Sequence, residues 1–280
     1  MSQPFGSRLA QAMDHNGPLC LGIDPHRHLL NAWGLNDDPA GLATFSKTVV
    51  EAAAETTGVA ALKPQVALYE RFGSAGFAVL EETLQLAREA KILTIADAKR
   101  GDIGSTMEGY AQAWLADGSA LAADAVTLSP YLGYESLRPA IDIALSHDRG
   151  VFVLALTSNP EGASVQHLGA ESDSVAKRIV DATGKDNAAA PALGSIGLVI
   201  GATVTETVKA LNIDLVRANA PILAPGYGAQ GAQAADMREG FGDAWKNVLV
   251  NSSRGILQHG PKVDALKSAI VDARKDLNVK

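Results

Sequence analysis

Residues 92–102 read ILTIADAKRGD, an apolar run that ends abruptly in alternating charges. The run from Ile92 to Lys99 has the length and composition of a buried strand in a parallel sheet. Asp97 and Lys99 are two residues apart, so on a strand their side chains point to the same face. Asp102 follows after one glycine-containing turn and could fold back over them. In a barrel of parallel strands, functional groups gather at such carboxyl ends.

Similar apolar runs recur along the chain, and each is followed by a segment of helical composition. The expected strands are residues 19–24, 59–64, 92–99, 125–128, 151–156, 196–201, 221–225 and 247–251. The expected helices include residues 75–90, 135–145, 205–218 and 263–277, with an extra helix around 172–182 inside the long 160–191 connection. Eight such units in a chain of this length predict an α/β fold, a (β/α)8 TIM barrel that occupies residues 1–280 as a single domain. A doubly wound open sheet is the alternative.

The composition narrows the class of partner. A net charge of −7 argues against general binding to nucleic acid or to an anionic membrane. The single cysteine, Cys20, suits a reducing compartment. No stretch approaches the roughly 18 apolar residues of a transmembrane helix, and the first residues lack the apolar core of a signal peptide. We therefore expect a cytoplasmic enzyme that acts on a small molecule, with no nucleic-acid or membrane partner.

Charged residues also stand at the ends of other expected strands. Asp24 ends the first and Lys63 the second. Lys63, Asp97, Lys99 and Asp102 alternate in sign, and opposite charges stabilise one another's ionised forms. A lysine held between two carboxylates stays protonated and can serve as a positioned acid. The alternative is that Asp97 and Lys99 form an ordinary buried ion pair.

A glycine-rich loop follows the seventh expected strand. Residues 226–231, GYGAQG, formally match the dinucleotide-binding pattern G-x-G-x-x-G, but that pattern belongs to a first strand–helix unit and needs an acidic residue about 20 positions later. Here position 251 is asparagine. The loop instead predicts a phosphate site in which Tyr227, Gln230 and Arg254 supply donors. A plain glycine turn with a solvated arginine is the alternative.

No metal site is expected. His26 and His28 are two residues apart, but they lie in a proline-started loop without a nearby carboxylate cluster.

Residues 97–103, DAKRGDI, resemble the D-x-K-x-x-D-I signature of the orotidine 5′-phosphate decarboxylase family. Segments 22–25, 62–65, 157–160, 224–231 and 253–255 resemble the other strand ends of its longer bacterial branch, so the resemblance spans nearly the whole chain. D-x-K-x-x-D alone also marks a wider group of phosphosugar decarboxylases and synthases. The choice between the decarboxylase family and this wider group is narrowed by four further residues, namely Lys63, Ile103, Thr106 and Gln230.

The resemblance implies a carboxy-lyase that converts orotidine monophosphate to uridine monophosphate and carbon dioxide without any cofactor, a step of de novo pyrimidine biosynthesis. Lys99 would donate the proton to the ring carbon, and Asp97 would sit against the substrate carboxylate. Asp102 and Thr106 would reach the site of a neighbouring subunit in a homodimer. The resemblance also implies a set of substrate-binding residues. Asp24 and Lys63 would bind the ribose, Ser158 and Pro225 the base, and Tyr227, Gln230, Ser253 and Arg254 the phosphate. Ile103 would be a further substrate-binding residue.

Two other functions remain open. The first is a magnesium-dependent phosphosugar decarboxylase or synthase of the same wider group. Those relatives carry an acidic residue at the end of the second strand, whereas Lys63 would repel a cation. The second is a catalytically inactive barrel that binds a nucleotide as a sensor.

Overall fold

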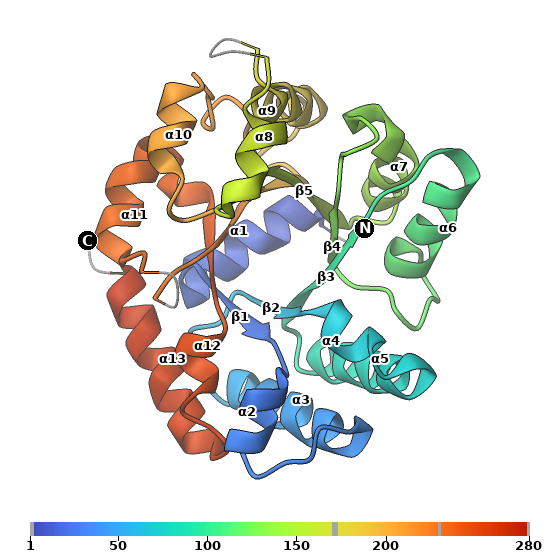
Figure 1. The fold of residues 1–280 in the computed structure, drawn as a ribbon, viewed down its shortest axis with the longest axis vertical. Coiled ribbons are helices and arrows are strands. Elements are labelled where there is room, and N and C mark those ends of the chain that lie inside the picture. Colours follow the sequence, from blue (N-terminus) through green and yellow to red (C-terminus); the bar gives the residue numbers. More distant parts are fainter. Residues whose placement is uncertain (1–2, 170–172, 229–230, 279–280) are drawn as a thin grey trace.

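The computed structural model describes residues 3–169, 173–228 and 231–278, and its eight parallel strands close into a barrel (Figure 1). Each strand pairs with the next in sequence, and β8 pairs with β1. The (β/α)8 prediction is confirmed, and the open sheet is wrong. The strands are β1 (Leu19–Ile23), β2 (Ala61–Pro64), β3 (Leu93–Arg100), β4 (Ala125–Leu128), β5 (Gly150–Leu156), β6 (Ile196–Ile200), β7 (Ile222–Pro225) and β8 (Val248–Ser252).

Helices surround the barrel on its outer side (Figure 1). Among the described residues, no helix has both the length and the apolar content to cross a membrane. The extra helix expected near 172–182 is α9, which begins at Val175 because the Ser174 hydroxyl accepts the Lys177 N–H at 3.1 Å. The helices are α1 (Phe5–Asn16), α2 (Arg27–Ala32), α3 (Pro39–Ala54), α4 (Val66–Glu70), α5 (Gly73–Glu89), α6 (Gly104–Leu115), η1 (Tyr134–Leu137), α7 (Arg138–Ser146), η2 (Pro160–Gly162), α8 (Ala163–Gln166), α9 (Val175–Asp186), α10 (Thr205–Ala210), α11 (Ala234–Phe241), η3 (Gly242–Asn247), α12 (Arg254–Leu257) and α13 (Val263–Asn278).

The helix expected over residues 205–218 is wrong in its second half, because α10 ends at Ala210. Leu211, Ile213 and Leu215 are buried while the residues between them are exposed. This alternation has a period of two, which a helix does not give. Asn212 also has a left-handed backbone, with φ of 50°. The chain therefore leaves the helix after Ala210 and buries these three side chains from a series of turns.

The amino-terminal helix α1 lies across the centre of the ring of strands in Figure 1. Phe5 and Leu9 are fully buried and belong to the cluster that fills the barrel interior. The Phe5 ring meets Phe152 of β5 edge to face, with centroids 6.0 Å apart. A Cβ at Gly150 would lie 2.2 Å from the Phe5 ring, so only glycine admits this ring. The helix closes the amino-terminal end of the barrel, and the carboxyl ends of the strands form its open face.

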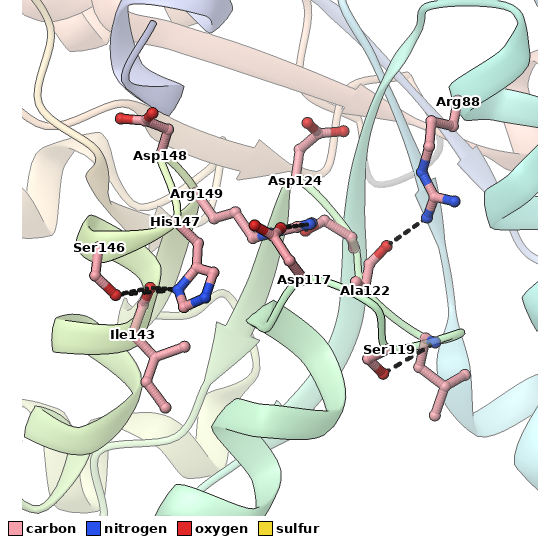
Figure 2. Close-up of polar contacts among 12 residues, drawn as sticks. Arg88, Asp117, Ser119, Ala122, Asp124, Ile143, Ser146, His147, Asp148 and Arg149 are labelled. Carbon is pink, nitrogen blue, oxygen red and sulfur yellow. Dashed lines mark hydrogen bonds and ion pairs between the residues drawn. The ribbon is translucent and has the colours of Figure 1, made fainter. Parts of the chain in front are cut away.

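Polar contacts join segments around the amino-terminal ends of β4 and β5. Figure 2 shows the Arg149 side chain pointing toward Asp117. Arg149 donates to the Ala123 carbonyl at 2.5 Å and to Asp117 at 2.9 Å. Asp124, just before β4, accepts from Arg8 of α1 at 2.5 Å. Charges at this end of a barrel serve stability. The contacts of Arg8 and Arg149 therefore stabilise the packing of α1 and of the β4–β5 region against the barrel.

Candidate active site

A cavity of about 440 Å³ opens at the carboxyl ends of the strands. It brings together residues that are far apart in the sequence, because all eight strand ends meet at one face of a closed barrel. Its lining includes eight residues singled out in the sequence, namely Asp24, Lys63, Asp97, Lys99, Pro225, Tyr227, Ser253 and Arg254.

Asp97 is the centre of a hydrogen-bond network inside this cavity. Its Oδ1 accepts from Lys99 Nζ at 2.6 Å and from the Thr127 hydroxyl at 2.9 Å. Its Oδ2 accepts from Lys63 Nζ at 2.9 Å and from Gln65 Nε2 at 3.1 Å. Four donors fill the acceptor positions of the carboxylate and fix its orientation.

Lys63 and Asp97 are both ionised at neutral pH. Burial raises the pKa of Asp97, but the charges of Lys63 and Lys99 outweigh burial and hold that pKa well below its usual range. Burial lowers the pKa of Lys63, yet Asp97 and Asp24 more than reverse this, and the pKa of Lys63 is raised. The Lys63 side chain is 5% exposed, whereas that of Lys99 is 45% exposed. Of these two lysines, Lys99 is therefore the one that a ligand in the cavity can contact more freely.

The backbone brings Asp97 and Lys99 together by an irregular path. The register of β3 against β4 shifts between Ala96 and Arg100. Lys99 has a left-handed backbone with φ of 49°, which is disfavoured for a residue with a Cβ. The alternation of a regular strand predicted a shared face for Asp97 and Lys99, but their contact arises at a bulge.

Three buried oxygens on neighbouring strand ends have no hydrogen-bond partner within the described part of the chain. They are Asp24 Oδ1, Asn251 Oδ1 and Ser253 Oγ. Gly22 makes their close approach possible, because a Cβ there would lie 1.9 Å from Ser253 Oγ. Unpaired buried polar atoms are costly, and their convergence on a cavity indicates a ligand rich in hydroxyl groups.

The predicted phosphate residues are only partly assembled. Tyr227 and Arg254 line the cavity. The Tyr227 hydroxyl donates to Asp276 of α13 at 2.6 Å, and burial together with Asp276 raises the pKa of Tyr227. Gln230 lies outside the described residues. Arg254 begins α12, the short helix after β8.

Other predicted residues lie outside the cavity lining. The Asp102 carboxylate accepts the Ile103 N–H at 2.8 Å, and no hydrogen bond or ion pair joins it to Lys63, Asp97 or Lys99 in the described chain. That Asp102 folds back over its own Asp97 and Lys99 stays a prediction. Ile103, Thr106 and Ser158 are exposed and do not line the cavity.

Sequence reasoning missed several lining or supporting residues. Gln65 stands two residues after Lys63, so the period of two could have placed both on one face. Asn251 ends the eighth expected strand. Thr127 lies in an apolar strand and carried no signal. His26 and His28 line the cavity with their rings 5.5 Å apart, but the described residues include no group of three or more His, Cys, Asp or Glu that could hold a metal.

A closed (β/α)8 barrel with a lysine–carboxylate–lysine network at its open face defines the chain as a barrel enzyme. Comparison with known proteins gives the family. The family model described as Orotidine 5′-phosphate decarboxylase / HUMPS matches residues 17–269, and the chain belongs to that family.

Curated and solved relatives agree with this membership. The chain is 54% identical over 268 residues to the orotidine 5′-phosphate decarboxylase of Streptomyces coelicolor, covering 95% of this chain and 94% of that one. It is 50% identical over 276 residues to that of Corynebacterium glutamicum strain R, covering 97% of each. A Streptomyces avermitilis crystal structure, provisionally assigned the same activity, has a TM-score of 0.93 and 53% identity, covering 99% of this chain and 95% of that one. The Leishmania donovani OMP decarboxylase structure has a TM-score of 0.77 and 28% identity, covering 99% and 98%.

Proposed function

We infer that the chain catalyses the decarboxylation of orotidine 5′-phosphate to uridine 5′-phosphate and carbon dioxide, a step of pyrimidine biosynthesis. One observation carries this proposal: the Lys63–Asp97–Lys99 network lines the cavity of a chain that is about half identical, over nearly its whole length, to orotidine 5′-phosphate decarboxylases. The Mg-dependent and inactive alternatives have no comparable support.

The network supplies the parts that a cofactor-free decarboxylation requires. The bond between the ring carbon and the carboxylate breaks, carbon dioxide leaves, and the electron pair stays on the ring carbon. The Lys99 ammonium transfers a proton to that carbon and is reprotonated from solvent. Asp97, ionised and held by four donors, repels the substrate carboxylate, and this repulsion disappears as carbon dioxide forms. A preorganised cation beside the reacting carbon stabilises the developing carbanion.

The substrate's sugar and base occupy the remaining walls of the cavity in this proposal. Asp24 and Lys63 bind the ribose hydroxyls, and the unpaired Asp24 Oδ1 supports that role. Pro225 lines the base pocket, and Ser158 at the rim reads the pyrimidine edge. The interior residues Leu154, Val199 and Leu223 give the cavity its apolar floor.

The phosphate lies at the loops after β7 and β8, the usual phosphate position of such barrels. Arg254 holds it in bidentate fashion, Ser253 offers a backbone amide, and Gln230 and Tyr227 add donors. For Tyr227 this requires that the phosphate displace Asp276 from the hydroxyl.

The proposal includes a homodimer in which Asp102 and Thr106 complete the partner's site. Within the described residues, no hydrogen bond or ion pair joins Asp102 to its own Lys99, and Ile103 beside it is 62% exposed. The loop after β4 lies against this segment, since Ser129 N–H donates to the Arg100 carbonyl at 2.8 Å. That loop presents further exposed apolar side chains, Tyr131 and Leu132. Exposed apolar groups beside a carboxylate that does not line its own cavity suit a surface covered by a second copy.

The proposal also places residues 1–280 in a single domain and the protein in the cytoplasm. The single cysteine supports the location, because a chain with one cysteine has no internal disulfide and suits a reducing compartment.

An absorbance assay tests the function. Purified protein in buffer with chelator should consume orotidine 5′-phosphate and form uridine 5′-phosphate, while the nucleoside orotidine reacts far more slowly. Activity that is lost with chelator and restored by magnesium would indicate the metal-dependent lyase instead. Tight binding of uridine 5′-phosphate without turnover would indicate the inactive barrel.

A further inference from the structure

We propose that Thr127 is a positioning residue that fixes Asp97 and Lys99 relative to each other, an inference that rests on the proposed function. Thr127 lies on β4, is 1% exposed and does not line the cavity. Its hydroxyl donates to Asp97 Oδ1 at 2.9 Å and accepts the backbone N–H of Lys99 at 2.9 Å. The hydroxyl therefore bridges the proton donor's backbone and the carboxylate that holds its ammonium.

The direction of both hydrogen bonds is fixed by chemistry. The Lys99 N–H can only donate, so the Thr127 oxygen must accept it. Asp97 is ionised and can only accept, so the hydroxyl proton must point to it. The Lys99 ammonium meets the same Asp97 oxygen at 2.6 Å. These three contacts close a ring that begins and ends on Lys99.

The bulge in β3 explains why a side chain is needed here. Ala96 pairs with Val126 and Arg100 pairs with Leu128, so residues 97–99 of β3 stand opposite Thr127 alone. The Lys99 N–H donates to the Thr127 side chain in place of a β4 carbonyl. The left-handed backbone of Lys99 is disfavoured and persists only where its surroundings hold it. Thr127, on the neighbouring strand β4, stabilises this backbone conformation through its hydrogen bond with the Lys99 N–H.

Loss of the hydroxyl should affect the chemical step more than binding. Asp97 would lose one of its four donors, and the Lys99 backbone would be free to relax. The groups proposed for the sugar and the phosphate, such as Asp24 and Arg254, lie just after β1 and just after β8 and would stay in place. If Thr127 contributed only its volume to packing, replacing it with valine would leave turnover unchanged.

Steady-state kinetics of Thr127→Val and Thr127→Ser test the proposal. Valine keeps the shape and removes the hydroxyl, so kcat should fall about 10- to 100-fold, while KM and the inhibition constant of uridine 5′-phosphate should change less than about threefold. Serine keeps the hydroxyl and should restore most of kcat. Thr83→Val is the matched control, because Thr83 is a buried threonine of α5 whose hydroxyl donates to the Val79 carbonyl at 2.7 Å. Its kcat should equal that of wild type.

Two results would overturn the proposal: a kcat for Thr127→Val within twofold of wild type, or equal losses in the serine and valine variants. If the valine variant does not fold, Thr127→Ser and Thr127→Ala give the same decision, because both lack the methyl group and only serine has the hydroxyl. A wild-type protein that does not decarboxylate orotidine 5′-phosphate would instead refute the proposed function.

Discussion

The buried ion pair between Lys63 and Asp97 makes the stability of the unliganded barrel sensitive to one substitution, Lys63→Met. Methionine has a similar length and no charge, so it removes the ammonium and leaves a side chain that suits the interior. The Lys63 side chain is 5% exposed and that of Asp97 is 9% exposed. After the substitution, Asp97 stays buried with Lys99, Thr127 and Gln65 as its remaining partners.

The expected cost follows from the geometry. At the observed 2.9 Å, the attraction between two unit charges is about 6 kcal/mol at an effective dielectric constant of 20. The net loss is smaller, because the desolvation penalty of the ammonium disappears with it. Breaking a buried pair by removing one partner costs about 3–5 kcal/mol. Since Asp97 keeps a second cation, Lys99, we expect the lower end, about 3 kcal/mol.

Thermal unfolding without ligand measures this loss. A cost of about 3 kcal/mol should lower Tm by about 6–12 °C in a chain of this size. Lys267→Met is the matched control, because Lys267 pairs with Glu55 at 3.0 Å on the surface, where ion pairs contribute little. The double variant Lys63→Met/Asp97→Asn should regain most of the lost Tm, since no uncompensated charge remains buried. A Lys63→Met Tm within 2 °C of wild type would refute the electrostatic account.

Three further results are expected. Arg254→Ala should weaken binding of uridine 5′-phosphate by at least about tenfold and leave uridine binding unchanged, as measured by calorimetry; equal losses for both ligands would remove Arg254 from the phosphate site. Mixing inactive Lys99→Ala and Asp102→Asn proteins should restore up to about one quarter of wild-type activity, because one site of each mixed dimer is intact; no recovery after subunit exchange would contradict a shared site. Because the pKa of Asp97 is lowered from 3.8, its ionised form stabilises the fold above that pH and loses this contribution as pH falls through the lower folded value. The stability gap between wild type and Asp97→Asn should therefore be constant near neutral pH and narrow below about pH 4 in urea titrations, whereas a gap that widens there would reverse the sign.

The fold could be predicted from the sequence because strand positions depend on local apolar runs. Each expected strand lies within two residues of an observed one. The helix over 205–218 failed in its second half because apolar spacing alone does not fix where a helix ends, and burial of Leu211, Ile213 and Leu215 favours the observed turns.

Only the residues that stand at strand ends and alternate in charge could be predicted as members of the site. Those features placed Asp24, Lys63, Asp97 and Lys99 at one cavity. They could not place Thr127, whose role depends on a bulge in the adjacent strand. A bulge depends on pairing between segments that are distant in the sequence, and a single apolar run gives no sign of it.

The most direct test of the account compares wild type with Lys99→Ala in the presence of chelator, by measuring carbon dioxide released and uridine 5′-phosphate formed from orotidine 5′-phosphate. We expect wild type to release one carbon dioxide for each uridine 5′-phosphate. We expect the variant to lose turnover at least about 1,000-fold while it still binds uridine 5′-phosphate with similar affinity, because the proton donor is absent and the sugar and phosphate contacts remain. Comparable turnover without Lys99 would contradict the assignment of the Lys63–Asp97–Lys99 network as the catalytic centre.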